Sequence, residues 1–175
     1  FNTPLQIENL FPLSKGITWA TLNNGGCFRI SDKECTVSSG IQYITAIDDV
    51  ELGKVSRVFE DKQGEEWVFS DKVVSIFGKR TISSYPFSMF ETMDNLVFLA
   101  SQNGRLAYYD VNTMQFNIVP FQEKIQHING IKVLKDNQLA VLSDKGLYLC
   151  HFPDLAMEKY DFSLFVKQIN GKTGN

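Results

Sequence analysis

Residues 16–30 read Gly-Ile-Thr-Trp-Ala-Thr-Leu-Asn-Asn-Gly-Gly-Cys-Phe-Arg-Ile, and the layout of this stretch returns at 64–77, 95–109 and 137–149. Each copy has an apolar strand, a short turn rich in Asn, Asp, Lys or Gly, and a second apolar strand. Asn-Gly, as at Asn24-Gly25, favours a tight hairpin because both central residues of that turn need positive φ. The sequence therefore predicts four diverged copies of one β-hairpin.

The spacing of the copies indicates which kind of repeat they form. The equivalent residues Trp19, Trp67, Phe98 and Ala140 lie 48, 31 and 42 residues apart. A mean period of about 40 residues is typical of a four-stranded propeller blade. The apolar runs are short, β-branched or aromatic, and separated by turn residues, which indicates strands rather than helices. We therefore predict an all-β fold of about four β-propeller blades, each with four antiparallel strands.

The predicted blades together form one propeller segment over residues 1–175, with blades at about 5–48, 54–85, 86–121 and 128–163 and a polar tail at 164–175. In the first blade, residues 34–38 and residues 41–47 are both candidates for the outer strand. Residues 48–53 are interpreted as an acidic connection to the next blade.

Four blades are the lower limit for a closed ring, because propellers have roughly 4 to 8 blades. We therefore expect an open arc that is part of a larger propeller. The end blades of an open arc expose apolar faces. Those faces would be covered by the remaining blades of a parent chain or by a homodimer.

The composition narrows the classes of partner. The chain has a formal net charge of −3 and no long basic run, which argues against a nucleic-acid partner. No stretch of about 18 apolar residues is present, so any membrane attachment would come through segments outside this chain. The 14 Phe residues suit the packing of large rings between stacked sheets.

The sequence offers little for metal or catalytic chemistry. The three cysteines lack a Cys-x-x-Cys spacing and no calcium-loop pattern occurs, so we predict no metal and no cofactor. Cys27 and Cys150 lie in strand patterns and are interpreted as buried small apolar residues, although a Cys27–Cys35 disulfide across a hairpin stays open. Neither His127 nor His151 has a nearby Ser and carboxylate arranged for nucleophilic catalysis, so no catalytic residue is predicted.

The two tryptophans allow two interpretations. Trp19 and Trp67 have the aromatic character of a sugar-stacking platform, but they recur at the same place in the repeat. That recurrence favours packing between blades.

A ligand site is expected on the face of the disc that collects the loops between second and third strands and the loops between blades. The loops that this predicts are 23–24, 48–49, 71–72, 83–85, 102–103, 126–129 and 144–145. From them we select Asp49, Tyr85, His127 and Asn129 as candidate ligand-binding residues, because such side chains hydrogen-bond and stack on sugars. The same residue types also form ordinary exposed turns.

The copies resemble the two-component regulator propeller repeat, whose consensus is close to D-x-x-G-x-x-W-x-G-T-x-x-G-L-x-x-Y-D. The matching positions are Gly16, Trp19, Thr21, Gly25, Phe28, Gly64, Trp67, Gly104, Leu106, Tyr109, Asp110, Gly146 and Leu147. The resemblance covers residues 5–162, whereas the Gly-His and Trp-Asp signatures of related propellers are not seen.

This resemblance implies a periplasmic sensor region of a Bacteroides-type hybrid two-component system, with the histidine kinase and membrane segment outside this chain. The implied function is a non-catalytic segment that senses a carbohydrate-derived ligand such as an oligosaccharide. The alternative is a protein-interaction scaffold without a small-molecule ligand. An enzyme is the third possibility, and it would need convergent His and carboxylate side chains in the channel.

Overall fold

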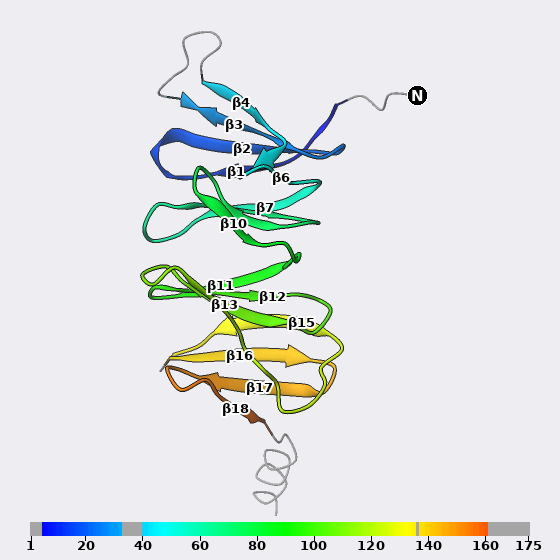
Figure 1. The fold of residues 1–175 in the computed structure, drawn as a ribbon, viewed down its shortest axis with the longest axis vertical. Coiled ribbons are helices and arrows are strands. Elements are labelled where there is room, and N and C mark those ends of the chain that lie inside the picture. Colours follow the sequence, from blue (N-terminus) through cyan, green and yellow to red (C-terminus); the bar gives the residue numbers. More distant parts are fainter. Residues whose placement is uncertain (1–4, 33–39, 136, 161–175) are drawn as a thin grey trace, which may run out of the picture.

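The structure, a computed structural model, describes residues 5–32, 40–135 and 137–160 as a stack of antiparallel sheets (Figure 1). The first sheet, blade 1, has the order β1 (Ile7–Pro12), β2 (Ile17–Leu22), β3 (Cys27–Ser31) and β4 (Ile41–Ile44), with a short 3-10 turn at Ser14–Gly16. The second, blade 2, contains β7 (Val55–Glu60), β8 (Glu66–Ser70), β9 (Val74–Ile76) and β10 (Arg80–Ser83).

The other two sheets follow the same up-and-down order. Blade 3 contains β11 (Met89–Met93), β12 (Leu96–Ala100), β13 (Leu106–Asp110) and β14 (Gln115–Ile118). Blade 4 contains β15 (Ile128–Val133), β16 (Gln138–Ser143), β17 (Gly146–His151) and β18 (Ala156–Lys159). Blades 1 and 4 lie at opposite ends of the stack, so the ring is open (Figure 1). The prediction of all-β propeller blades in an open arc is confirmed.

In blade 1 the structure shows which segment forms the outer strand, and an additional hairpin that the sequence analysis missed follows it. Residues 41–44 pair with β3, while residues 34–38 lie outside the described part of the chain. Residues 48–53 lie between blade 1 and blade 2, and part of this connection is ordered. A small hairpin, β5 (Ala46–Ile47) and β6 (Val50–Glu51), turns at Asp48 and Asp49, which both have positive φ. Two consecutive residues with positive φ are the mark of a tight hairpin turn.

The core consists of three apolar layers, one between each pair of neighbouring blades. Trp19 packs edge-on against Phe77 of blade 2, and Trp67 packs edge-on against Tyr109 of blade 3. Both indoles have an exposed fraction of 0%. The interpretation of the two tryptophans as packing between blades agrees with this burial, since no face of either ring is open to a sugar. Between blades 3 and 4, Phe98 takes the equivalent place.

Polar contacts also join blades 1 and 2. Glu66 on β8 accepts a hydrogen bond from Trp19 Nε1 at 2.6 Å. It also accepts two from Arg29, Nε at 2.9 Å and Nη2 at 2.7 Å, which is the bidentate arrangement that suits a guanidinium and a carboxylate. The Arg29 guanidinium in turn lies 5.1 Å from the centre of the Phe77 ring. One carboxylate therefore joins two strands of blade 1 to blade 2.

Replacement of Glu66 tests this link. In a Glu66→Gln variant the Arg29 guanidinium loses its ion pair with Glu66 in a mostly buried site, where the two side chains are 17% and 12% exposed. We expect the free energy of unfolding to fall by about 3 kcal/mol, measured by urea unfolding with tryptophan fluorescence. As a control, Glu51→Gln removes the exposed Lys72–Glu51 pair and should leave the midpoint near that of the wild type. Equal effects of the two changes would contradict the structure.

The two described cysteines are free and buried. Burial raises the pKa of the Cys27 thiol to about 12 and that of the Cys150 thiol to about 11, because desolvation disfavours the thiolate. The thiolate is the reactive form, so both thiols should resist Ellman's reagent near neutral pH in the folded protein. In a Cys35→Ser variant we expect no rapid reaction until guanidinium unfolds the chain, after which both thiols react. Fast labelling of the folded variant would show that one of the two thiols is accessible.

Candidate functional site

The first strand of each blade lies innermost. Strand β1 contacts β7, β11 contacts β15, and residues of β7, β11 and β15 line one common hollow. These inner strands form the axial side of the arc, which is the side that faces the centre of a propeller.

Three of the four inner strands contain a β-bulge at the same relative place. The pairing register shifts between Ile7 and Asn9 in β1, between Val55 and Arg57 in β7, and between Ile128 and Gly130 in β15. Strand β11 pairs with β12 without a shift. The extra residues are Glu8, Ser56 and Asn129, and all three are exposed. A bulge re-aims side chains and often lies beside a functional site.

Two hollows meet on the axial side, and together they are called the axial groove. The smaller has a volume of about 250 Å³ and is lined by Met89, Gln102, His127, Ile128 and Asn129. The larger has a volume of about 480 Å³ and is lined by Ser56, Arg57, Ser88, Met89, Phe90, Asn129, Gly130 and Ile131. Met89 and Asn129 line both hollows, so the two are adjacent, and the lining of the groove comes from three blades.

His127 sits where the loop between blades 3 and 4 enters the smaller hollow. Its Nδ1 lies 3.2 Å from the carbonyl oxygen of Gln102, and a carbonyl can only accept, so the contact requires a proton on Nδ1. In the neutral ring Nε2 then carries a lone pair and is the atom left to accept from a ligand. The backbone is held as well, because the amide nitrogens of Gln126 and His127 donate to Asp144 Oδ1 at 3.1 Å.

Tyr85 lies outside the axial groove, beside the loop between β12 and β13 that contains Gln102. Its hydroxyl accepts a hydrogen bond from Asn103 Nδ2 at 3.3 Å, and the Arg105 guanidinium carbon lies 3.8 Å from the ring centre. Residues 102–105 therefore contact Tyr85 through Asn103 and Arg105, and contact His127 through Gln102. The Tyr85 ring is covered on one face by Arg105, so its open surface is reduced.

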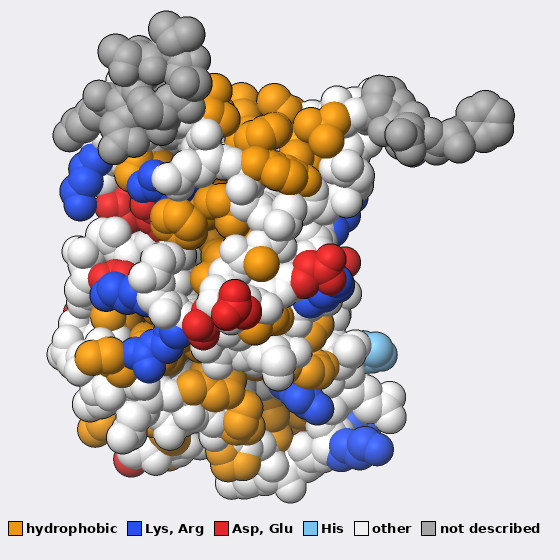
Figure 2. Space-filling view, turned by 45° about the horizontal axis from the view of Figure 1, so that its top comes forward, with side chains coloured by type: hydrophobic (Ala, Val, Ile, Leu, Met, Phe, Trp, Pro, Cys, Tyr) orange, Lys and Arg blue, Asp and Glu red, His pale blue; other side chains and the backbone are white. Residues whose placement is uncertain are grey.

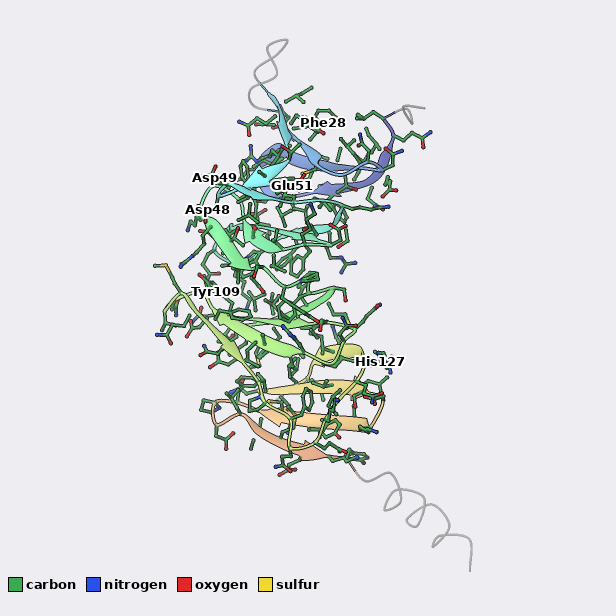
Figure 3. The ribbon with its side chains drawn as sticks, turned by 45° about the vertical axis from the view of Figure 1, so that its right-hand side comes forward. Phe28, Asp48, Asp49, Glu51, Tyr109 and His127 are labelled. Atoms are coloured by element: carbon green, nitrogen blue, oxygen red, sulfur yellow. The ribbon has the colours of Figure 1, made fainter. Side chains whose placement is uncertain are left out.

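Asp49 lies apart from the other three candidate residues. It forms the tip of the β5–β6 hairpin together with Asp48, and Figure 3 shows both on the opposite side of the stack from His127. Asp48 Oδ2 lies 3.5 Å from the Thr81 nitrogen, which places the tip over the outer strand β10. The structure thus brings His127 and Asn129 together, places Tyr85 next to them, and separates Asp49.

Sequence reasoning missed Ser56, Arg57 and Ser88. The first two form an adjacent polar pair between the apolar residues Val55 and Val58, which breaks the alternation of a regular strand. Such a break is a signal of a bulge. Ser88 is exposed just before β11 and carries no pattern that would have distinguished it from an ordinary loop serine.

A third hollow of about 450 Å³ lies between blades 3 and 4, away from the axial groove. Five of its lining side chains belong to the apolar layer between these blades, namely Met93, Leu96, Tyr108, Phe152 and Leu155. We interpret it as the open margin of that packing layer.

Other site types find no support in the described residues. In this part of the chain, no three His, Cys, Asp or Glu side chains gather closely enough to hold a metal ion. Across 5–32, 40–135 and 137–160, no helix is long and apolar enough to cross a membrane.

The sequence matches no family profile and no curated protein. Among solved structures, the chain is similar to the extracellular domain of BT3049 from B. thetaiotaomicron, which is assigned to a hybrid two-component system. The TM-score is 0.63 at 15% identity, and the match covers 91% of this chain and 23% of that one. The extracellular domain of BT4673 from the same organism, also assigned to a hybrid two-component system, gives a TM-score of 0.60 at 15% identity, with 91% and 27% covered.

The chain is similar in fold, and to the same degree, to an enzyme. Virginiamycin B lyase from Staphylococcus aureus gives a TM-score of 0.62 at 14% identity, with 91% of this chain and 57% of that chain covered. The chain spans about a quarter of the length of the two extracellular domains it matches. Likeness at this level of identity shows the fold, which is an arc of propeller blades. The proteins that share this fold include extracellular domains of two-component systems, as the repeat resemblance implied.

Gly104 allows the loop between β12 and β13 to approach the segment that leads to His127. Its φ is +79°, and a Cβ there would lie 2.4 Å from the backbone oxygen of Ile125, in the segment that leads to His127. A Gly104→Ala variant should therefore displace that segment and lower the thermal midpoint. Gly78→Ala is the matched control, because its φ of +71° imposes similar backbone strain but a Cβ would meet nothing within 4 Å. We expect Gly78→Ala to cost about 1 kcal/mol, and Gly104→Ala clearly more; equal costs would contradict the close approach.

Proposed function

We propose that the chain is a non-catalytic, ligand-binding segment of an extracytoplasmic sensor propeller in a two-component signalling protein, and that a carbohydrate-derived ligand binds in the axial groove. The observation that carries the proposal is the groove itself, in which Asn129 on the β15 bulge and His127 face a common space with apolar side chains. The likeness in fold to extracellular domains of two-component systems supports the sensor class.

The chemistry of the groove suits a sugar. A sugar ring presents hydroxyl groups at its edge and C–H groups on its faces. The groove offers the Asn129 amide, the Ser88 hydroxyl and His127 for the edge, and Met89 and Ile131 for a face. The larger hollow, at about 480 Å³, falls within the roughly 300–1,000 Å³ of small-molecule sites.

The residues of the groove argue for binding without catalysis. Glycoside hydrolysis uses a pair of carboxyl groups, one acting as acid and one as nucleophile or base. The residues that line the two hollows include no Asp and no Glu. Asp144, the carboxylate bonded near His127, is occupied by backbone amides rather than by the imidazole ring. This arrangement supports the non-catalytic proposal over an enzyme.

Further blades would complete the ring. On the outer face of blade 1, four large apolar side chains are 54–60% exposed, namely Ile7, Leu10, Ile41 and Tyr43. Figure 2 shows hydrophobic side chains gathered over this end of the molecule. Each of the other three blades has the corresponding face covered by the preceding blade. In the two-component neighbours the matched segment is about a quarter of a longer chain, which supports the remaining blades of a parent chain as the cover.

The same apolar face favours the second candidate function, a protein-interaction scaffold. In that case a second copy of this chain or another protein would cover blade 1, and the axial groove would bind nothing. For the sensor function we further propose a periplasmic location, with the membrane segment and histidine kinase in parts of the protein beyond this chain.

A thermal-shift screen of the intact protein against neutral and acidic oligosaccharides tests the ligand. A ligand at 100 times its dissociation constant should add about 2.7 kcal/mol to the stability of the folded state. We expect one glycan class to raise the midpoint in a dose-dependent way, and Asn129→Ala to abolish the shift. Asn103→Ala, which changes an exposed amide next to Tyr85 outside the groove, should keep it. No shift with any glycan, together with dimers in solution, would favour the scaffold.

A further inference from the structure

Arg57 is the feature of the axial groove that the proposed function leaves unused. It follows the bulged residue Ser56 in β7, is exposed, and lines the larger hollow. Its guanidinium carbon lies 5.5 Å from the centre of the Phe90 ring, and Phe90 itself stacks on Phe59 with a centroid distance of 3.9 Å. The cation thus rests on an aromatic surface at the floor of a ligand-sized space.

The carboxylates of the inner strands all contact groups other than Arg57. These strands carry three acidic residues, Glu8, Glu60 and Glu91. Glu8 pairs with Lys54 at 2.9 Å, and Glu91 pairs with Lys132 at 2.9 Å. Glu60 accepts hydrogen bonds from the backbone nitrogen and hydroxyl of Ser14, at 2.8 and 2.6 Å. Within the described residues, no carboxylate lies within ion-pair distance of Arg57.

The local charge is therefore positive although the whole chain has a formal net charge of −3. The lining of the groove contains Arg57 and His127 and no acidic residue. A guanidinium held over an aromatic face keeps its N–H groups free at the edge, where they match the two oxygens of a carboxylate or a sulfate. The Ser88 hydroxyl and the Asn129 amide line the same hollow and supply further donors.

We propose that the axial groove selects an acidic saccharide, and that Arg57 binds the anionic group of that ligand, a carboxylate or a sulfate. The inference rests on the proposed function, because it takes the axial groove as the saccharide site. It adds a residue that determines specificity: Asn129 and His127 serve any sugar, whereas Arg57 distinguishes a charged sugar from a neutral one.

The test compares three oligosaccharides of similar length, one neutral, one bearing uronate carboxylates and one bearing sulfates, by titration calorimetry with the intact protein at low salt. We expect one of the acidic ligands to bind about 10- to 100-fold more tightly than the neutral one, the range for a hydrogen-bonded charge. The uronate and sulfate arms identify which anion the site takes. Added salt should lower the affinity for the acidic ligand and leave the affinity for the neutral one unchanged.

Arg57→Gln should remove the preference for the acidic ligand and keep the affinity for the neutral one, whereas Arg57→Lys should restore part of the preference. Arg80→Gln is the matched control: Arg80 also lies over a ring, that of Tyr109 at 5.7 Å, but on the outer strand β10. The Arg80→Gln variant should bind all three saccharides with the affinities of the wild type.

Three outcomes separate the two proposals. Equal affinity for neutral and acidic saccharides, sensitive to Asn129→Ala, would overturn the role of Arg57 and leave the proposed function standing. A preference for acidic saccharides that survives in folded Arg57→Gln would also overturn that role. Absence of binding by all three saccharides would overturn the proposed function and this inference together.

Discussion

The packing of one four-stranded sheet on the next is the interaction on which the rest of the molecule depends. A single small sheet exposes two faces and cannot hold an apolar core alone, so each blade is stable only against its neighbours. The three apolar layers meet this need with large rings: Trp19, Trp67 and Phe98 are each 0% exposed at equivalent positions. Glu66 adds directional hydrogen bonds to the first layer, since its carboxylate joins Trp19 and Arg29 of blade 1 to blade 2.

This stacking also creates the candidate site. Because the first strand of each blade lies innermost, residues that are distant in sequence meet on the axial side. Bulges in β7 and β15 leave Ser56 and Asn129 exposed there, while unshifted β11 contributes Met89 and Phe90 between them. The inner-strand carboxylates are bonded to their own partners, which leaves the groove with basic and neutral polar groups over an apolar floor.

Prediction from sequence worked well for features that depend on local pattern. The four hairpins, their strand type and the interior role of Trp19 and Trp67 follow from turn residues and from recurrence at one place in the repeat. Among the candidate ligand residues, His127 and Asn129 meet in one groove, Tyr85 lies beside it, and Asp49 lies on the opposite side of the stack (Figure 3). The hairpin that carries Asp49 was missed because its strands are two residues long, too short for any period to show.

The sequence by itself determined that this chain builds repeated antiparallel blades, because turns and alternating apolar residues act over only a few positions. Its composition also set the formal net charge of −3, since charge adds up along the chain regardless of fold. Only the tertiary structure decided which polar residues share a site. The groove draws on segments around Ser56, Met89 and Asn129, and their meeting depends on the angle between blades. The exposure of Arg57 beside Phe90 has the same origin, because a bulge arises from strand pairing and not from the residue alone.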